Sequence, residues 1–261
     1  VLEGKKPRLI DEWQEAPPLW DAVRHKVDQT AEKGQYILTG SATPNHKGVL
    51  YSGAGRIARL RMRPMSLYES GESSGRVSLK DLCEGKLTPV MTGDVDLRNL
   101  SAYIVRGGWP GNLDTPADRA GWLPAEYLNA VIEDDVYRID NVKRNPTKMR
   151  LLLRSLARNE STTVTNKTLK NDVKEMDDED IDTDTISSYL DVFKRLFLTD
   201  NQKPFATQIR SSVRVKQAEK RHFSDPSLAC ALLKATPERL LNDLQTLGFL
   251  FEALCERDLK I

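Results

Sequence analysis

The chain has 261 residues, and its 39 Lys and Arg residues balance 38 Asp and Glu residues to a formal net charge of +1. This balance excludes a protein that binds polyanions over its whole surface, so a nucleic-acid role would need a local basic patch. Hydrophobic residues make up 39% of the chain and charged residues 30%, which is typical of a charge-rich globular protein of one to three domains.

Several features that would indicate other classes are missing. No apolar run approaches the roughly 20 residues that a membrane helix needs, and the first residues do not form a signal peptide. The three cysteines, Cys83, Cys230 and Cys255, are widely spaced and odd in number. This argues against a disulfide framework or a zinc site. We therefore expect a cytoplasmic protein that does not contact membranes.

Two short apolar runs near the start each end abruptly in polar residues. They cover residues 7–12 (PRLIDE) and 36–41 (YILTGS). Such runs are typical of buried parallel strands, and ligands gather at the carboxyl ends of such strands in open α/β sheets. We predict neighbouring parallel strands that bring Asp11 and Ser41 to one edge, within reach of one bridging water.

The polar residues after these runs suggest nucleotide chemistry. In a P-loop ATPase, an acidic residue at the position of Asp11 holds the Mg²⁺ that bridges the phosphates, and a neighbouring carboxylate such as Glu12 can activate water. The alternative is that Asp11 and Glu12 only favour the start of a helix. The hydroxyls of Thr39 and Ser41 support the first reading, since they follow the second strand and are placed to reach a γ-phosphate.

Between and after the two strands, the pattern predicts a helix that opens at residues 16–18 and stops at Gly34. A loop follows over residues 43–54. Residues 56–63 partly alternate, with Ala58, Leu60 and Met62 on one face and arginines on the other, which predicts a strand with one solvated face. The arginines on the other face either protect an exposed edge strand by their charge or form a basic stripe with a functional role.

Farther along, helices are expected over residues 97–105 and from residue 116 to about residue 142. The acidic run Glu133-Asp134-Asp135 in the second is read as a solvated face, because adjacent residues on a helix point in different directions. Residues 143–146 are read as a hinge.

Three short helices and a hairpin are then expected. The helices lie over residues 149–156, from Thr165, and from Asp184 or Thr185, and the hairpin joins 197–210 to 211–223. This order is that of a winged helix with the third helix as recognition element. An acidic linker, residues 172–184, precedes that helix and would repel phosphate. The helix end and hairpin carry a basic rim of Lys194, Arg195, Arg210, Arg214, Lys216, Lys220 and Arg221.

The segments PRLIDEWQEAPPLWDAVRHKVD and GQYILTGSATP resemble the Walker B to sensor 1 region of a prokaryotic ATPase family. Its members join an AAA+-like ATPase domain to a C-terminal domain of unknown function. Four further segments resemble the family in the family's order, so the resemblance covers nearly the whole chain: GRIARLRMRPMSLYE, YIVRGGWPG, FSDPSLACAL and GFLFEALCERDL.

The resemblance implies ATP and Mg²⁺ as cofactors, and it assigns roles to individual residues. Asp11 would be the metal ligand. Glu12 and Ser41 would be catalytic, Thr39 and Ser41 would bind the nucleotide, and Arg56 would be the arginine finger. Apart from the resemblance, Arg106 is either a second phosphate-sensing arginine or part of a structural salt bridge, and the salt bridge is the favoured reading. In the family the last helix opens a restriction-endonuclease-like region, in which Glu252 would be a nuclease carboxylate only if the chain continued.

The phosphate-binding loop GxxxxGK[ST] does not occur in the sequence, whereas the family carries it before the Walker B strand. Its backbone amides and lysine supply most of the phosphate grip. We therefore expect an internal segment of a longer ATPase, truncated at both ends, that binds ATP weakly and is inactive by itself.

The expected fold class is α/β followed by mainly α: part of a P-loop NTPase parallel sheet, a helical region and a winged-helix-like domain. The expected divisions are an ATPase part at 1–70, a helical lid or linker at 71–144, a winged-helix-like part at 145–223 and the start of a C-terminal domain at 224–261.

Three functions stay open at this stage. The first is an AAA+-like ATPase in which the nucleotide switches a winged-helix module. The second is a winged-helix adaptor that binds DNA or a protein without ATPase activity. The third is a structural segment with neither activity. Nucleotide is the expected partner, DNA or protein the further one, and the oligomeric state is open.

Overall fold

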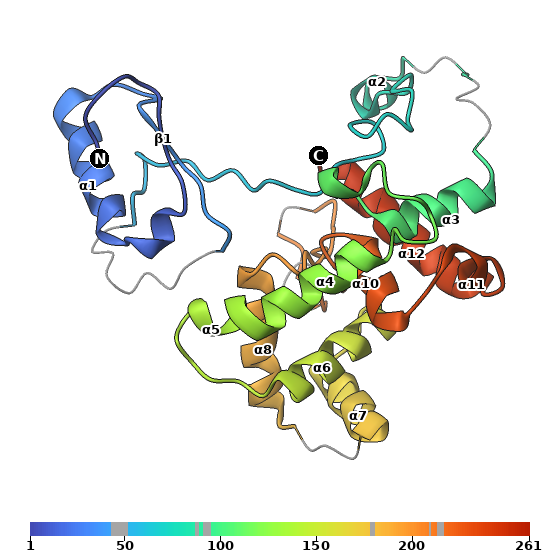
Figure 1. Cartoon of the computed structure of the whole chain (residues 1–261). Coiled ribbons are helices and arrows are strands. Elements are labelled where there is room, and N and C mark those ends of the chain that lie inside the picture. The colour runs from blue at the N-terminus through green and yellow to red at the C-terminus, as the bar shows by residue number, and fades with distance from the viewer. Residues whose placement is uncertain (43–51, 87–88, 91–94, 178–180, 209, 213–216) are drawn as a thin grey trace.

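The structure is a computed structural model of the chain, and it describes residues 1–42, 52–86, 89–90, 95–177, 181–208, 210–212 and 217–261. In Figure 1 the N-terminal part with α1 and β1 lies to one side of a larger helical part. A segment without regular secondary structure joins the two.

The N-terminal part is a strand–helix–strand unit. β1 (Arg8–Ile10) and β2 (Tyr36–Leu38) are parallel neighbours, with Arg8 opposite Tyr36 and Ile10 opposite Leu38. A 3₁₀ turn (Trp13–Glu15) and α1 (Pro18–Thr30) connect them. The prediction of two neighbouring parallel strands is confirmed.

A small separate core holds this unit together. It consists of Ile10, Trp13, Trp20 and Val23, and the two tryptophan rings lie with centroids 4.8 Å apart. The helix ends at Thr30 rather than at Gly34, because Ala31 takes a left-handed conformation, with φ 55°, and its amide bonds to Val27 O.

The larger part is helical. Its long helices are α3 (Leu97–Arg106), α4 (Trp122–Ala130), α6 (Pro146–Arg158), α7 (Asn166–Asp177), α8 (Thr183–Arg195), α10 (Pro226–Leu233) and α12 (Leu244–Leu259). The short ones are α2 (Leu79–Cys83), a 3₁₀ turn (Pro110–Asn112), α5 (Val136–Arg138) and α11 (Pro237–Leu241). One hydrophobic core runs through this part from Ile104 to Leu254.

Three of the four expected divisions contribute to this core, since it contains Val105, Leu152 and Leu228 alike. α10 packs on α6, α3 and α4, and so residues after 223 are not set apart from those before. The four-part division itself stays a prediction.

Two helix boundaries differ from expectation. The long helix starts at Trp122 rather than residue 116 and ends at Arg138, with a π-helical turn (Val131–Asp135) inside it. The third helix of the next group starts at Thr183, because the Asp182 carboxylate accepts hydrogen bonds from Asp184 N at 2.9 Å and Thr185 N at 2.7 Å. The acidic linker thus supplies the cap.

The predicted strand over residues 56–63 is wrong. The segment has no strand partner among the described residues, and its burial is the reverse of a strand with an inward apolar face. Leu60 and Met62 are exposed, whereas Arg61 and Arg63 are half-buried and form ion pairs with Asp200. Charge pairing decides which face turns inward.

The region expected to be a winged helix has part of the expected order. α6, α7 and α8 are followed by two antiparallel bridges, Thr199 with Phe223 and Gln202 with Lys220. Arg214 and Lys216 lie outside the described residues. The winged-helix assignment stays a prediction.

Candidate functional site

The polar residues that follow β1 and β2 meet at one edge of the small sheet. Thr39 Oγ1 donates a hydrogen bond to Asp11 Oδ1. Ser41 Oγ donates to Glu12 Oε2 at 3.2 Å. The four residues singled out from the sequence therefore form two cross-strand pairs at the carboxyl ends of the strands.

The backbone turns sharply at Glu12 to make this possible. Glu12 has φ 48° and ψ 45°, a left-handed conformation that is unfavourable for a residue with a side chain. Thr39 N donates to Ile10 O at 3.0 Å, and Trp13 N donates to Thr39 O at 3.1 Å. These two bonds hold the turn against β2, so that Asp11 and Glu12 stay at the sheet edge.

Gln14 closes the edge from the side. Its Nε2 lies 3.3 Å from Ser41 Oγ and also contacts Glu12 Oε2. A Cβ atom on Gly40 would lie 2.3 Å from Gln14 Oε1. The glycine between Thr39 and Ser41 thus leaves the space in which Gln14 reaches both groups.

A pocket of about 700 Å³ lies beside this edge, within the usual range for small-molecule sites. Glu12, Gln14 and Ser41 line one side of it, together with Glu15, Pro17 and Ala42. The other side comes from the helical part, through Asp135, Arg138, Ile139, Asp140, Asn141 and Leu196. The sheet edge therefore faces the end of the α4–α5 helix across the pocket.

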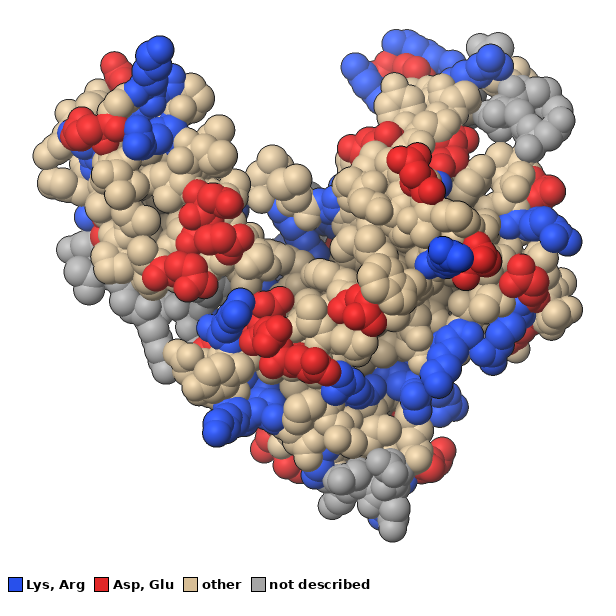
Figure 2. Space-filling view, viewed as in Figure 1, with Lys and Arg blue, Asp and Glu red and all other residues tan. Residues whose placement is uncertain are grey.

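The pocket is acidic. Figure 2 shows Asp and Glu side chains gathered on both parts where they approach each other. Burial raises the pKa of Asp135, Arg138 opposes this, and the charges of Asp134 and Glu12 add to it. Among the described residues that line the pocket, Arg138 is the basic one. A free polyanion would be repelled here, whereas a nucleotide accompanied by a cation would not.

The oxygen donors at the edge fit Mg²⁺ in a limited way. Among the described residues, no three His, Cys, Asp or Glu side chains are grouped as a metal site. Asp11 and the Thr39 hydroxyl offer one carboxylate and one neutral oxygen. Mg²⁺ commonly takes one or two protein carboxylates and completes its shell with water and substrate phosphates. The residues therefore fit a metal that arrives with phosphates.

The arginines singled out from the sequence lie elsewhere. Arg56 Nε binds Asp28 Oδ1 at 2.5 Å, and Arg106 Nη1 binds Glu72 Oε1 at 2.5 Å. Neither lines the pocket. The ion pair of Arg106 confirms the structural salt bridge that was the favoured reading of this residue, whereas the role of Arg56 as arginine finger stays a prediction. Sequence reasoning missed Arg138, because only its place on the wall of the pocket beside the sheet edge distinguishes it from other exposed arginines.

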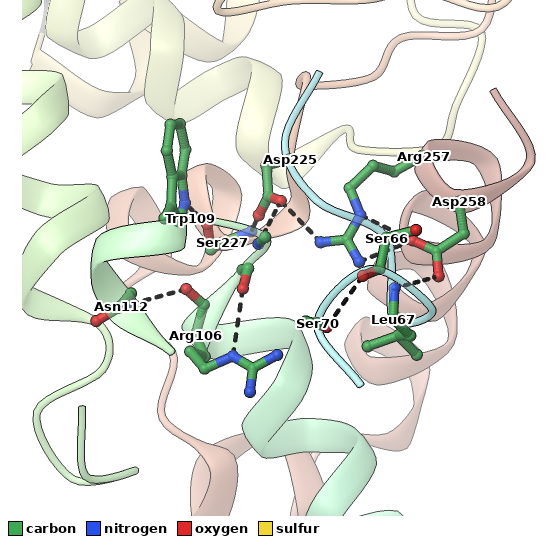
Figure 3. Close-up of polar contacts among 12 residues, drawn as sticks. Ser66, Leu67, Ser70, Arg106, Trp109, Asn112, Asp225, Ser227, Arg257 and Asp258 are labelled. Atoms are coloured by element: carbon green, nitrogen blue, oxygen red, sulfur yellow. Dashed lines mark hydrogen bonds and ion pairs between the residues drawn. The ribbon is translucent and has the colours of Figure 1, made fainter. Parts of the chain in front are cut away.

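A second polar cluster joins segments that are far apart in the sequence (Figure 3). The fully buried Asp225 accepts hydrogen bonds from Gly108 N at 2.9 Å, from Ser227 N at 2.9 Å and from Arg257 Nη1 at 2.8 Å. Trp109 Nε1 donates to Ser227 Oγ at 2.8 Å.

The cluster also holds the segment that leads in from the N-terminal part. Asp258 binds Arg257 and accepts a hydrogen bond from Leu67 N at 3.1 Å. Among these side chains every buried polar atom has a partner. A cluster that satisfies all of its own groups is built for holding segments together rather than for binding a ligand.

Glu252 is engaged in a surface contact. Its carboxylate pairs with Lys220 Nζ, and both side chains are partly exposed. None of the described helices has the length and apolar character needed to cross a membrane.

Comparison with known proteins gives two matches to protein families. Residues 2–71 match the model of an AAA domain, and residues 97–239 match a domain of unknown function, DUF8612. No curated protein and no solved structure matches the chain. The second match covers more than half of the chain. The chain therefore belongs to the DUF8612 family, with an AAA domain segment in front of that domain.

Proposed function

We propose that this chain is part of an AAA-like protein that binds and hydrolyses ATP with Mg²⁺. The observation that carries the proposal is the pair of contacts at the sheet edge, Asp11 with Thr39 and Glu12 with Ser41, beside a pocket of about 700 Å³. The match of residues 2–71 to an AAA domain supports it.

The residues divide the work by their chemistry. Asp11 would hold Mg²⁺, which supplies charge neutralisation on the phosphates when bound. Glu12 would orient and deprotonate the attacking water, and Ser41, with Thr39, would contact the γ-phosphate. In-line phosphoryl transfer needs mainly positioning and charge stabilisation. The Ser41 hydroxyl donates a hydrogen bond to Glu12. A γ-phosphate that binds Ser41 would therefore alter the contacts of the residue proposed as the base.

The pocket also gives a reason for coupling to the helical part. Its second wall consists of Asp135, residues 138–141 and Leu196. A ligand that fills the pocket contacts both parts, so that binding and hydrolysis change how the α4–α5 helix sits against the sheet edge. This supports a nucleotide-dependent switch.

Substitutions at Asp11 and Glu12 test the proposal in a longer protein that carries a GxxxxGK[ST] loop together with this chain. Glu12→Gln keeps shape but loses basicity, and hydrolysis should slow by ~10²-fold or more while nucleotide binding persists. Asp11→Asn should weaken Mg²⁺-dependent binding as well as turnover. Steady-state ATPase rates and nucleotide affinities are measured beside thermal midpoints. Wild-type turnover in both variants would remove the two residues from the mechanism.

A second candidate is a winged-helix adaptor without ATPase activity. The order of α6, α7 and α8 before two antiparallel bridges favours it. If the adaptor is correct, Asp11→Asn and Glu12→Gln should both bind a DNA or protein partner as tightly as the wild type does, with and without ATP.

A further inference from the structure

The exposed face of α6 carries a row of arginines. Arg150, Arg154 and Arg158 follow one another at four-residue spacing, which places them on one side of a helix. The opposite side is buried, through Met149, Leu152, Leu153, Leu156 and Ala157. The helix contains four basic residues and no acidic one. At 1.5 Å per residue the row is roughly 12 Å long.

α7 packs against α6 and adds a second row. Lys167, Lys170 and Lys174 are spaced by three and four residues and so share one side of the helix, whereas Leu169 and Val173 are buried. In Figure 2 Lys and Arg side chains form a band across the region of α6 and α7. Together the two rows make what we term the α6–α7 basic surface, consisting of Arg150, Arg154, Arg158, Lys167, Lys170 and Lys174.

Part of this charge is not neutralised. Arg150 pairs with Glu133 at 2.8 Å, and Arg158 lies 3.6 Å from Asp172. Arg154, Lys167 and Lys174 are exposed and form no ion pair with a described residue. α7 also carries Asp172, Glu175 and Asp177, which equal its three lysines in number, so the surplus of positive charge lies on α6, which has no acidic residue.

The basic rim expected around α8 and the hairpin is used differently. Arg195 lies 3.7 Å from Asp140, Lys220 pairs with Glu252, and Arg221 donates to Asn166. These cations serve internal contacts. Lys194 and Arg210 of the same rim are exposed, but the regularly spaced rows of cations lie on α6 and α7.

We propose that the α6–α7 basic surface binds the phosphate backbone of duplex DNA without reading its sequence. A duplex offers one negative charge per about 1.7 Å of axis, so a row of cations some 12 Å long meets several phosphates. α6 and α7 contain no aromatic residue, and stacking on aromatic side chains is what single strands require. They expose no apolar anchor of the kind that membrane-surface helices insert.

The test compares two triple variants of the chain that remove equal charge. The first is Arg154→Gln, Lys167→Gln and Lys174→Gln, on the basic surface. The control is Lys5→Gln, Lys33→Gln and Lys80→Gln, three exposed lysines elsewhere. Binding to a fluorescent 20-base-pair duplex of arbitrary sequence is measured by anisotropy from roughly 50 to 200 mM salt.

We expect the first variant to lose at least about tenfold in affinity at low salt and to lower the salt slope by about 1 per lysine or arginine removed. The control should bind like the wild type. Equal losses in both variants, or no binding of the wild-type chain at low salt, would overturn the proposal. Tighter binding of a single strand than of the duplex would overturn it as well.

A folding defect is controlled in two ways. Gln has a helix propensity close to those of Lys and Arg, and circular dichroism of both triple variants shows whether the helices persist. The single variant Arg154→Gln removes one exposed cation and should reduce the salt slope by about 1. An unchanged slope in that variant would count against the surface.

Discussion

Arg257 in α12 and Asp225 at the start of α10 form an ion pair that is almost fully removed from solvent, with Nη1 and Oδ2 2.8 Å apart. Burial lowers the pKa of Arg257, but the charges of Asp225 and Asp258 outweigh it and hold that pKa above its usual value. The same carboxylate caps α10 and binds Gly108 N, so one side chain ties together three segments.

Removing one partner of this pair should be costly. In Asp225→Asn the Arg257 guanidinium stays buried without its main counter-charge, and the free energy of unfolding should fall by about 3–5 kcal/mol. Urea unfolding followed by circular dichroism measures the change. Lys26→Ala removes the solvent-screened pair with Glu3 and should leave the free energy of unfolding nearly unchanged. A similar small cost in both variants would contradict the structural role of Asp225.

Gly108 and Gly248 provide a matched pair of substitutions. A Cβ atom at residue 108 would lie 2.1 Å from the backbone oxygen of Met65, which cannot move aside easily. Gly108→Ala should lower the free energy of unfolding by roughly 1–3 kcal/mol or more. At Gly248, inside α12, a Cβ would meet nothing within 4 Å. Gly248→Ala should raise it by about 0.5–1 kcal/mol. Thermal and urea unfolding of the two variants give opposite signs if the packing is as described.

The buried Glu160 should make stability depend on pH. Burial raises the pKa of Glu160, although His222, whose Nδ1 lies 3.0 Å away, and Phe223 N oppose the rise. An acid whose pKa is higher in the folded state binds more protons there, so its contribution to stability falls as the pH rises above the unfolded value of about 4.3. Glu160→Gln keeps one acceptor oxygen, which can serve Phe223 N, and places a neutral amide beside His222, so it should remove this fall. The unfolding free energy of the variant minus that of the wild type should therefore become more positive as the pH is raised from about 4 to about 7. A difference that stays constant over this pH range would contradict the role of Glu160 in the pH dependence of stability.

Asp200 holds the segment that joins the two parts of the chain. It pairs with Arg61, Arg63 and Lys260. Burial opposes its ionisation, but the bond from Arg63 and the charges of Arg61 and Lys260 keep its pKa below the usual value.

Asp200→Asn should therefore free this segment. We expect trypsin to cleave after Arg61 at least several-fold faster, because local opening exposes the backbone, whereas the bond after Arg63 precedes Pro64 and resists trypsin in every variant. Mass spectrometry of timed digests identifies the sites. Asp28→Asn, which releases Arg56 instead, should leave cleavage after Arg61 unchanged. Equal rates in all three proteins would show that Asp200 does not restrain the segment.

Arg138 should contribute to nucleotide chemistry if the proposed function holds. It is the basic residue among those described around the pocket, so Arg138→Ala should lower ATP turnover in the longer protein by about 10²-fold, the scale of a lost charge-stabilising donor. Arg119→Ala removes an exposed arginine outside the pocket and serves as control. If Arg138→Ala turns over ATP normally while Glu12→Gln is inactive, the proposed site stands. Only the contribution of Arg138 to turnover is then excluded.

The sequence alone determined the strand pair and the residues at its ends. Apolar runs of three or four residues that stop at Asp11 and Thr39 specify both the strands and the polar edge, because each property is local to the chain. Helix starts were equally local: the hydroxyl of Thr165 accepts a hydrogen bond from Thr168 N at 3.2 Å, as its position predicted.

Only the tertiary structure decided what lies across space from these residues. The alternation over residues 56–63 predicted an apolar face turned inward, but the distant Asp200 pairs with the arginines and turns Leu60 and Met62 to solvent. Nothing near Arg138 in the sequence marks it as a neighbour of Glu12. Long-range packing decides which charged side chains come into contact. A single sequence shows composition and hydrophobic periodicity, but it does not show which distant side chains line the same pocket.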